Sequence, residues 1–249
     1  MGVEPVSGTP WWLSYRFGTG LVVDFYRNLL EWEMVEDGDF GACGPGFSCY
    51  LDGKNVAYLS PIVEPGYGGD PEWYVNFYCD NLDRSIVGVS VAGGIITSIG
   101  GSEAEERSAT FRDPMHGSFG CIQTAKFGDF STFGRRHGLC WIDLRTPEVD
   151  KIVKFYSDAL DWSAQPTLLI GRNPERYNMA AKGRYGEVEE FASISGASSY
   201  AHWRPYFSVG SLPKAVTKAS KLGGRVHWMA DRFADLTDPG GVPFGVAEF

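Results

Sequence analysis

Residues 21–32, LVVDFYRNLLEW, return 130 positions later as KIVKFYSDALDW, residues 151–162. Both copies place a Phe-Tyr pair seven and six residues before a Trp, and in the second copy Ile152, Phe155, Tyr156, Ala159 and Leu160 fall at helical spacing. Further aromatic and glycine landmarks recur at the same offset: Trp73 and Trp203, Gly53 and Gly183, Gly93-Gly94 and Gly223-Gly224. Chance does not produce so many matches in one order, so the chain is a tandem duplication.

Composition indicates a globular protein with an unusual amount of aromatic surface. The chain has 249 residues, of which 43% are hydrophobic and 21% charged, and this length allows one sizeable core or two small ones. The aromatic share is 14%, with eight Trp. Such residues either fill a core or line a ligand pocket, and both uses are expected here.

Charge and cysteine usage restrict the possible partners and compartments. The net charge is −9 and the sequence shows no cluster of Lys or Arg, so nucleic acid and anionic membranes are not expected partners. The five Cys lack metal-binding spacing, which favours reduced thiols. No signal-peptide pattern and no apolar stretch of about 18 residues occurs, so we expect a cytoplasmic protein without membrane spans.

Each copy is predicted to contain the same elements in the same order. Opening strands are expected at 11–16 and 140–145, and helices at 20–30 and 148–160. Short strands follow at 46–51, 55–60, 176–181 and 187–194, then strands at 73–79 and 203–209. Helices at 81–92 and 211–222 end in Gly-Gly, and the final strands lie near 107–112, 118–123, 232–237 and 243–248. The prediction is an α+β fold with tandem βαβββ modules at 1–125 and 137–249, joined by a linker at 126–136.

Two motifs carry a resemblance to a known superfamily. Thr146-Pro147 after a strand, followed by Phe155-Tyr156 and Leu160-x-Trp162, forms one; Asp238-Pro239 with Phe244-Gly245 forms the other. Together they resemble the glyoxalase/bleomycin-resistance/dioxygenase superfamily, also called vicinal oxygen chelate, and in particular its two-module actinobacterial-type members. The resemblance covers roughly residues 8–125 and 137–249. It implies curved mixed sheets with helices outside and a cupped ligand cavity, and it does not fix the activity.

The resemblance also implies positions for metal ligands, which in enzymatic members are His, Glu or Gln from four strands. Three of these positions can be read in both copies: Trp12 and Trp141, Tyr74 and Arg204, and Gly120 and Gly245. Trp, Arg and Gly side chains do not ligate divalent metals, and Tyr does so only in special sites. A fourth position could be Glu189 or Glu190, but one carboxylate is not a site. We therefore expect no metal and no cofactor.

The four histidines do not fall at these positions. His116, His137, His202 and His227 lie in predicted turns or at strand ends, where surface histidines are common. His116, in the turn Asp113-Pro114-Met115-His116, is retained as an alternative acid–base group.

Strand alternation predicts which side chains face the cup. If Ile142 and Leu144 face the helices, their neighbours Trp141, Asp143 and Arg145 face the ligand. The predicted ligand-binding residues are Trp12, Ser14, Arg16, Tyr74, Asn76, Tyr78, Trp141, Arg145 and Ser208. This lining suits a polycyclic or conjugated small molecule. In the competing interpretation the aromatic residues fill the groove, and Asp143 forms a satisfied ion pair with Arg145 or Arg204.

Three residues of the second copy are candidates for proton transfer. Asp143 could act as a general base, Arg204 could stabilise an oxyanion, and Tyr206 could donate a hydrogen bond to it. The leading hypothesis is a metal-independent protein that binds a hydrophobic or aromatic small molecule, and the resemblance implies antibiotic resistance or secondary metabolism. The alternatives are a cofactor-free cyclase, isomerase or lyase and, more distantly, a metal-dependent glyoxalase- or dioxygenase-like enzyme. Because two modules can pair within one chain, a monomer or a homodimer is expected.

Overall fold

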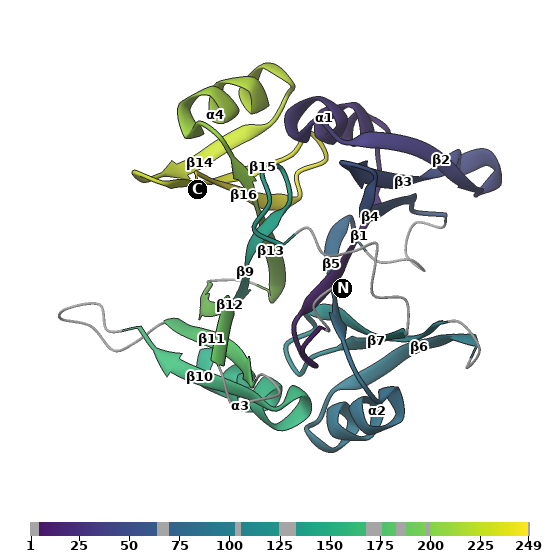
Figure 1. The fold of residues 1–249 in the computed structure, drawn as a ribbon, viewed down its shortest axis with the longest axis vertical. Helices are drawn as coiled ribbons and strands as arrows, with labels where there is room; N and C mark the ends of the chain where they lie inside the picture. The colour runs from purple at the N-terminus through teal and green to yellow at the C-terminus, as the bar shows by residue number, and fades with distance from the viewer. Residues whose placement is uncertain are drawn as a thin grey trace. The chain divides into compact units, whose positions relative to one another are not determined.

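The computed structural model describes residues 5–63, 70–102, 106–124, 133–167, 176–182, 188–197 and 200–248. These residues form two eight-stranded sheets and four α-helices, one sheet from each sequence repeat (Figure 1). The α+β prediction is confirmed. Of the predicted linker 126–136, residues 126–132 lie outside the described part of the chain.

The first repeat supplies eight strands, two α-helices and a short 3-10 helix. Its elements are β1 (Pro10–Phe17), α1 (Leu21–Leu30), β2 (Glu33–Asp39), η1 (Gly41–Cys43), β3 (Pro45–Leu51), β4 (Lys54–Pro61), β5 (Glu72–Tyr78), α2 (Leu82–Val91), β6 (Ile95–Ser102), β7 (Glu106–Arg112) and β8 (Ser118–Thr124). The strands are ordered β2-β3-β4-β1-β5-β8-β7-β6. β1 pairs in parallel with β4 and β5 with β8, and the paired hairpin strands are antiparallel.

The second repeat has the same topology. Its elements are β9 (Leu139–Thr146), α3 (Val149–Leu160), β10 (Trp162–Pro166), β11 (Arg176–Lys182), β12 (Val188–Gly196), β13 (His202–Val209), α4 (Leu212–Lys221), β14 (Arg225–Met229), β15 (Phe233–Thr237) and β16 (Pro243–Glu248). The order β10-β11-β12-β9-β13-β16-β15-β14 matches that of the first sheet position by position. The duplication read from the sequence is therefore a duplication of the fold.

The sequence prediction missed the strand that follows each helix, namely β2, β6, β10 and β14. All four stand at the outer ends of the sheets. A strand at an edge buries little of either face, so it carries no alternation of apolar and polar residues. β2, for example, exposes six of its seven residues and half-buries the other.

Alternation in the opening strand has the predicted phase. Leu13 and Tyr15 are buried, whereas Ser14 and Arg16 are half-buried. The buried side chains face the aromatic core that the helices cover, so Ser14 and Arg16 lie on the face away from the helices.

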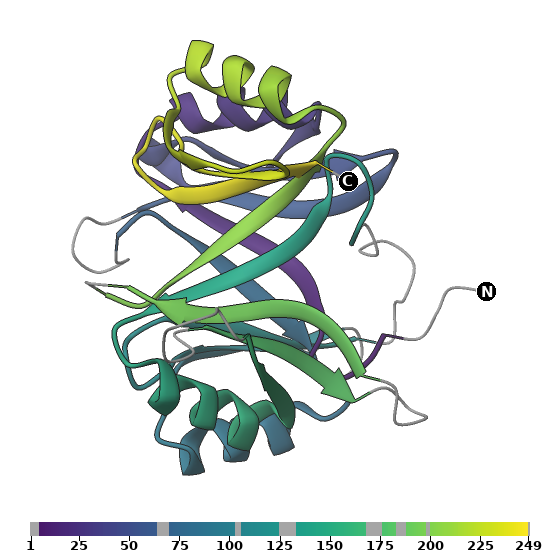
Figure 2. The same cartoon turned by 90° about the vertical axis from the view of Figure 1, so that its left-hand side faces the viewer.

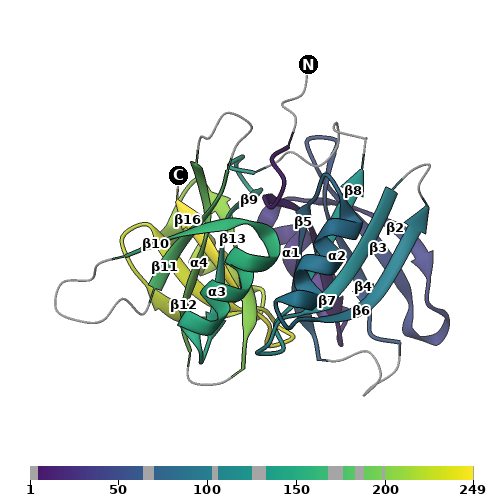
Figure 3. The ribbon, with the colours of Figure 1, turned by 90° about the horizontal axis from the view of Figure 1, so that it is seen from below.

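The chain divides into two compact units, and each takes residues from both repeats. The first unit comprises Met1–Trp12, Tyr74–Gly128 and Ile142–Trp203; the second comprises Leu13–Trp73, Asp129–Trp141 and Arg204–Phe249. In the second unit α1 lies beside α4, as Figure 2 shows. In the first unit α2 lies beside α3 (Figure 3), and Gly88 of α2 permits close packing because a Cβ there would lie 2.9 Å from the carbonyl oxygen of Ala159.

A buried aspartate stabilises the aromatic core of each unit. In the second unit Asp238 Oδ2 accepts hydrogen bonds from the hydroxyls of Tyr15 (2.7 Å) and Tyr26 (3.0 Å). In the first unit Asp113 Oδ2 accepts one from Tyr156 at 3.3 Å. Each aspartate therefore belongs to one repeat and holds tyrosine from the other.

The same aspartates also fix the turns in which they lie. Asp113 Oδ1 accepts the backbone N–H groups of Met115 and Gly117, and Asp238 Oδ1 accepts those of Gly240 and Val242. Desolvation by burial raises the pKa of both carboxyl groups above the ordinary value, and the hydrogen bonds oppose that rise.

None of the described helices is long and apolar enough to cross a membrane.

Candidate functional site

Three polar side chains of the second repeat meet on the strand face away from the helices. Phe207 of β13 is buried in the aromatic core against Tyr26 and Trp73. Strand alternation therefore turns Tyr206 and Arg204 to the other face. Asp235 of β15 is on that face too, because its neighbours Ala234 and Leu236 are buried on the helix side.

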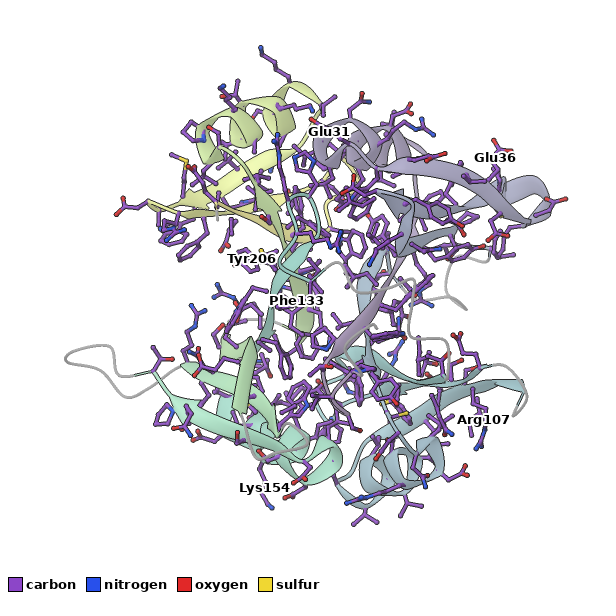
Figure 4. The ribbon with its side chains drawn as sticks, in the orientation of Figure 1. Glu31, Glu36, Arg107, Phe133, Lys154 and Tyr206 are labelled. Atoms are coloured by element: carbon purple, nitrogen blue, oxygen red, sulfur yellow. The ribbon has the colours of Figure 1, made fainter. Side chains whose placement is uncertain are left out.

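Asp235 binds both of these side chains. The Tyr206 hydroxyl donates to Asp235 Oδ1 at 2.6 Å, and Arg204 forms an ion pair with Asp235 Oδ2. Tyr206 is 6% exposed, and it extends from β13 in Figure 4. A charged pair at this depth is less screened than one at the surface, so the triad of Arg204, Tyr206 and Asp235 has a fixed geometry.

Gly245 makes room for the tyrosine ring. It pairs with Tyr206 across the parallel β13–β16 ladder, and a Cβ on Gly245 would lie 2.1 Å from Tyr206 Cδ1. No real side chain tolerates such a contact. The ring of Tyr206 thus occupies the space that a side chain on the closing strand would fill.

Aromatic side chains flank the triad. Phe233 meets Tyr206 edge-to-face at a centroid distance of 6.4 Å, and Trp228 lies 5.2 Å from Phe233. Trp228 is 50% exposed and Phe233 36%, which is unusual for residues of this size. Trp141 packs against the buried cluster of Cys140, Tyr206 and Ala247 from its half-buried position. The face therefore combines exposed rings with an oriented polar group.

The first repeat is uncharged at the equivalent positions. Tyr74, Asn76 and Thr110 stand where the second repeat has Arg204, Tyr206 and Asp235. Asn76 Nδ2 donates to the carbonyl oxygen of Trp12 at 3.4 Å. Its Oδ1 lies over Gly120, where a Cβ would approach it to 2.0 Å. The backbone arrangement is the same, and the chemistry is different.

Asp143 is brought together with Arg145, but as a satisfied ion pair. The Asp143 side chain is almost fully buried, and its Oδ2 lies 2.6 Å from Arg145 Nε. Ser193 and Ser195 of β12 donate hydroxyl hydrogen bonds to Oδ1 at 2.7 and 2.9 Å. Because these partners use the carboxylate's acceptor positions, the group is better suited to orienting Arg145 than to abstracting a proton.

Asp143 and the triad belong to different compact units, the first and the second respectively. The matching position to Arg145 in the first repeat is Arg16, whose Nη2 lies 2.7 Å from Glu72 Oε1. Ser14 is half-buried beside it on β1.

The remaining predicted residues have mainly structural surroundings. Tyr78 and Ser208 are 7% and 3% exposed, and their backbone N–H groups donate to the carbonyl oxygens of Thr9 and Gly138. His116 is exposed in the turn between β7 and β8, with φ of 68°. It lies in the predicted turn.

His137 lies in a turn, as expected for the histidines, but its side chain is not at the surface. It is buried with φ of 64°, and its carbonyl oxygen accepts the Trp32 Nε1 hydrogen bond at 2.9 Å. Desolvation lowers the pKa of its imidazole, with Arg136 and Lys218 adding to the effect and Glu31 opposing it.

The residues at the superfamily's ligand positions do not fit a divalent metal. Asn76 and Tyr206 fill the space above the two glycines, and Arg204 brings a positive charge to the position where a metal ligand would stand. Glu190 is exposed and accepts a hydrogen bond from Asn178, while the side chain of Glu189 lies outside the description. Among the described residues, no group of three His, Cys, Asp or Glu could hold a metal ion.

Sequence reasoning missed the partners of its own candidates. Asp235, Glu72, Ser193 and Ser195 bind the predicted Arg and Asp residues across strands. A signal for Asp235 was present, since it lies ten residues before Gly245 just as Thr110 lies ten before Gly120. Comparing the repeats at that position exposes a Thr-to-Asp change opposite Tyr206.

Comparisons with known proteins agree with this architecture. Residues 141–247 match the glyoxalase-like domain family. No curated protein sequence matches the chain. The fold is similar to that of the 2,3-dioxygenase LapB from Pseudomonas sp. KL28, with 13% identity and a TM-score of 0.67 over 98% of this chain and 94% of that one.

Two further solved structures show the same likeness. The Mn(II)-bound glyoxalase from Novosphingobium aromaticivorans has 15% identity and a TM-score of 0.70, over 98% of this chain and 83% of that one. The 2,2',3-trihydroxybiphenyl 1,2-dioxygenase from Sphingomonas wittichii strain RW1 has 13% identity and a TM-score of 0.67, over 98% and 91%. The chain therefore has the fold of these dioxygenases and of this glyoxalase, and its second repeat is similar to the glyoxalase-like domain family.

Proposed function

We propose that this protein binds a planar aromatic or conjugated small molecule on the β13–β16 face of its second repeat, without a metal. The observation that carries the proposal is the triad of Arg204, Tyr206 and Asp235 beside the exposed rings of Trp228 and Phe233. Exposed aromatic rings next to an oriented polar group are typical of small-molecule sites.

The polar triad would orient the ligand. Asp235 accepts hydrogen bonds from Tyr206 and Arg204 and so orients both side chains, and the ligand would meet the Tyr206 oxygen and the guanidinium group of Arg204. These groups complement a phenol, enol or carbonyl on the edge of a ring system. Stacking on Trp228 and Phe233 would supply most of the affinity.

The donor set described above supports metal independence, because Arg204 stands at one ligand position and the Tyr206 ring fills the space above Gly245 at another. The neighbours in fold include a Mn(II)-bound glyoxalase, so the proposal has a direct test. Stoichiometric Mn, Fe, Ni or Zn in purified protein, measured by elemental analysis, would refute it.

A cofactor-free cyclase or isomerase is the second candidate. The Tyr206 hydroxyl lies 2.6 Å from a carboxylate that is ion-paired to Arg204, and such a pair can move a proton to or from a bound enol. Asp235 would then take the part that sequence reasoning gave to Asp143. In either case we propose a place in antibiotic resistance or secondary metabolism, where ligands of this class occur.

Binding of a panel of hydroxylated polycyclic compounds tests the site. We expect Trp228→Ala and Phe233→Ala each to weaken the binding of an active compound about tenfold, because each removes a stacking surface. Ser108→Ala at the position equivalent to Phe233 in the first repeat is the matched control and should leave affinity unchanged. Equal affinity in the wild type and both aromatic variants would show that the ligand binds elsewhere on the protein.

Mass spectrometry separates a binder from an enzyme. A sequestering protein returns the compound unchanged, whereas a cyclase or isomerase yields a new species. If a product forms, Asp235→Asn should lower kcat with little change in KM, because the amide keeps the shape and loses the charge.

A further inference from the structure

A second concave site lies in the same compact unit, away from the triad. This cleft of about 440 Å³ opens between the end of α1, the segment around residues 136–137 and the first turns of α4. Glu31, labelled in Figure 4, stands at its α1 side. The cleft shares no residue with the aromatic face that binds the proposed ligand.

Three cationic side chains from two segments line this cleft. Lys214 and Lys218 are one helical turn apart on α4, and the Arg136 guanidinium lies over Gly210, where a Cβ would stand 3.4 Å from Arg136 Cζ. α4 has no acidic residue, and Lys221 continues its basic face. Arg136 is far from the two lysines in the sequence, which shows no cluster of Lys or Arg. The fold nevertheless brings the three cationic side chains to one cleft.

Among the described residues that line the cleft, Glu31 is the one acidic side chain, and it neutralises the cations incompletely. Glu31 lies 3.7 Å from Lys218 Nζ and 3.6 Å from His137 Nδ1, and its side chain is 61% exposed. Ion pairs of this length at the surface are weak. The cleft thus retains positive charge in a chain whose net charge is −9.

The first compact unit provides an internal comparison. The corresponding cleft, of about 330 Å³, is lined by Ser7 and Gly8 in place of Arg136 and His137. It has Arg84 in place of Lys214, and Gly88 in place of Lys218. Three aspartates also line it: Asp80, Asp158 and Asp161. One architecture therefore gives an acidic cleft in the first unit and a basic cleft in the second, so the positive charge does not come with the fold.

We propose that the basic cleft binds a compact polyvalent oxyanion, such as a phosphate ester or a polycarboxylate. Arginine matches the paired oxygens of either group, and the two lysines add charge around a volume suited to a small metabolite. Binding here is independent of the aromatic ligand, so either proposal can fail alone.

Titration of the ¹⁵N-labelled full chain with pyrophosphate and, separately, with citrate tests the site at constant ionic strength. We expect saturable shifts of the backbone resonances at Arg136–His137 and Gly210–Lys214. Lys214→Gln/Lys218→Gln should weaken binding at least tenfold. Lys151→Gln/Lys154→Gln on α3, which removes the same charge elsewhere, is the matched control and should retain the affinity of the wild type. Preference for one probe identifies the ligand as a phosphate or a carboxylate compound.

His137 gives a second readout at the site. Desolvation by burial lowers the pKa of its imidazole, Arg136 and Lys218 lower it further, and Glu31 and Asp52 raise it. A bound anion offsets the two cations, so saturation with the active probe should move the His137 titration to higher pH. Loss of affinity in both double variants alike, shifts that do not saturate, or an unmoved His137 titration would each overturn the proposal.

Discussion

The two repeats keep one backbone and differ in the chemistry of one face. Across β5, β7 and β8 the first repeat has Tyr74, Asn76 and Thr110; across β13, β15 and β16 the second has Arg204, Tyr206 and Asp235. In both, a glycine on the closing strand accommodates the central side chain. The two sets of side chains stand at the same strand register. The fold therefore tolerates a new polar network where a glycine leaves room for it.

The largest losses of stability should follow removal of the buried aspartate from either repeat. Asp238 accepts two tyrosine hydroxyls and two backbone N–H groups, whereas Asp113 accepts one hydroxyl and two N–H groups. We expect Asp238→Ala to lower the free energy of unfolding by about 4 kcal/mol and Asp113→Ala by about 3 kcal/mol. Urea denaturation followed by tryptophan fluorescence measures both values. A larger loss of stability in Asp113→Ala than in Asp238→Ala would show that the number of tyrosine hydrogen bonds does not determine which variant is less stable.

Substitution of the closing-strand glycines should cost less stability than removal of the aspartates, but it should separate the two repeats more clearly. A Cβ at Gly245 collides with the rigid ring of Tyr206, which Asp235 holds in place, whereas a Cβ at Gly120 meets the movable amide of Asn76. We expect Gly245→Ala to cost about 3 kcal/mol of stability and Gly120→Ala about 1 kcal/mol. Thermal and chemical unfolding of the two variants measures both stability costs. Equal costs would mean that Tyr206 is free to move, and the fixed geometry of the triad would be wrong.

The smallest expected effect concerns pH. His137 occupies the position of Gly8 in the first repeat, and both have left-handed backbone conformations. Because desolvation lowers the folded-state pKa of His137 below the ordinary 6.5, the folded protein binds the proton less readily than the unfolded chain. The stability that this provides is present above pH 6.5 and is lost as the pH falls through the lowered pKa.

His137→Gly makes the second repeat like the first at this point. The stability of the variant should decline less than that of the wild type between pH 7.5 and pH 5.5. Its stability at pH 7.5 should stay within about 1 kcal/mol of the wild type, because glycine suits the left-handed conformation. Unfolding curves at the two pH values measure the change. An unaltered pH dependence would assign the decline to other groups.

The fold was predictable because its signals are local or repeated. Landmarks such as Phe25 and Phe155 fix the register of the copies, and the alternation around Ile142 orients β9. The site was predictable only in part. Tyr206 and Arg204 were found from alternation, but their partner Asp235 is 31 residues from Arg204 and meets it only through sheet order.

The surroundings of single side chains were likewise invisible in the sequence. Alternation turns Ser208 from the core, yet its side chain is only 3% exposed. The sequence also did not show that Ser193 and Ser195 donate hydrogen bonds to Asp143. Such hydroxyl groups on a neighbouring strand decide whether a carboxylate is available to accept a proton.

The reciprocal aspartates have an evolutionary consequence. Each compact unit needs a turn from one repeat and tyrosine from the other, so a single ancestral copy could have completed its cores only by pairing with a second copy of itself. Fusion removed the need for two chains to meet, and it also freed the copies to diverge. The charged triad of one half and the neutral counterpart of the other are what a symmetric dimer of identical chains could never have had.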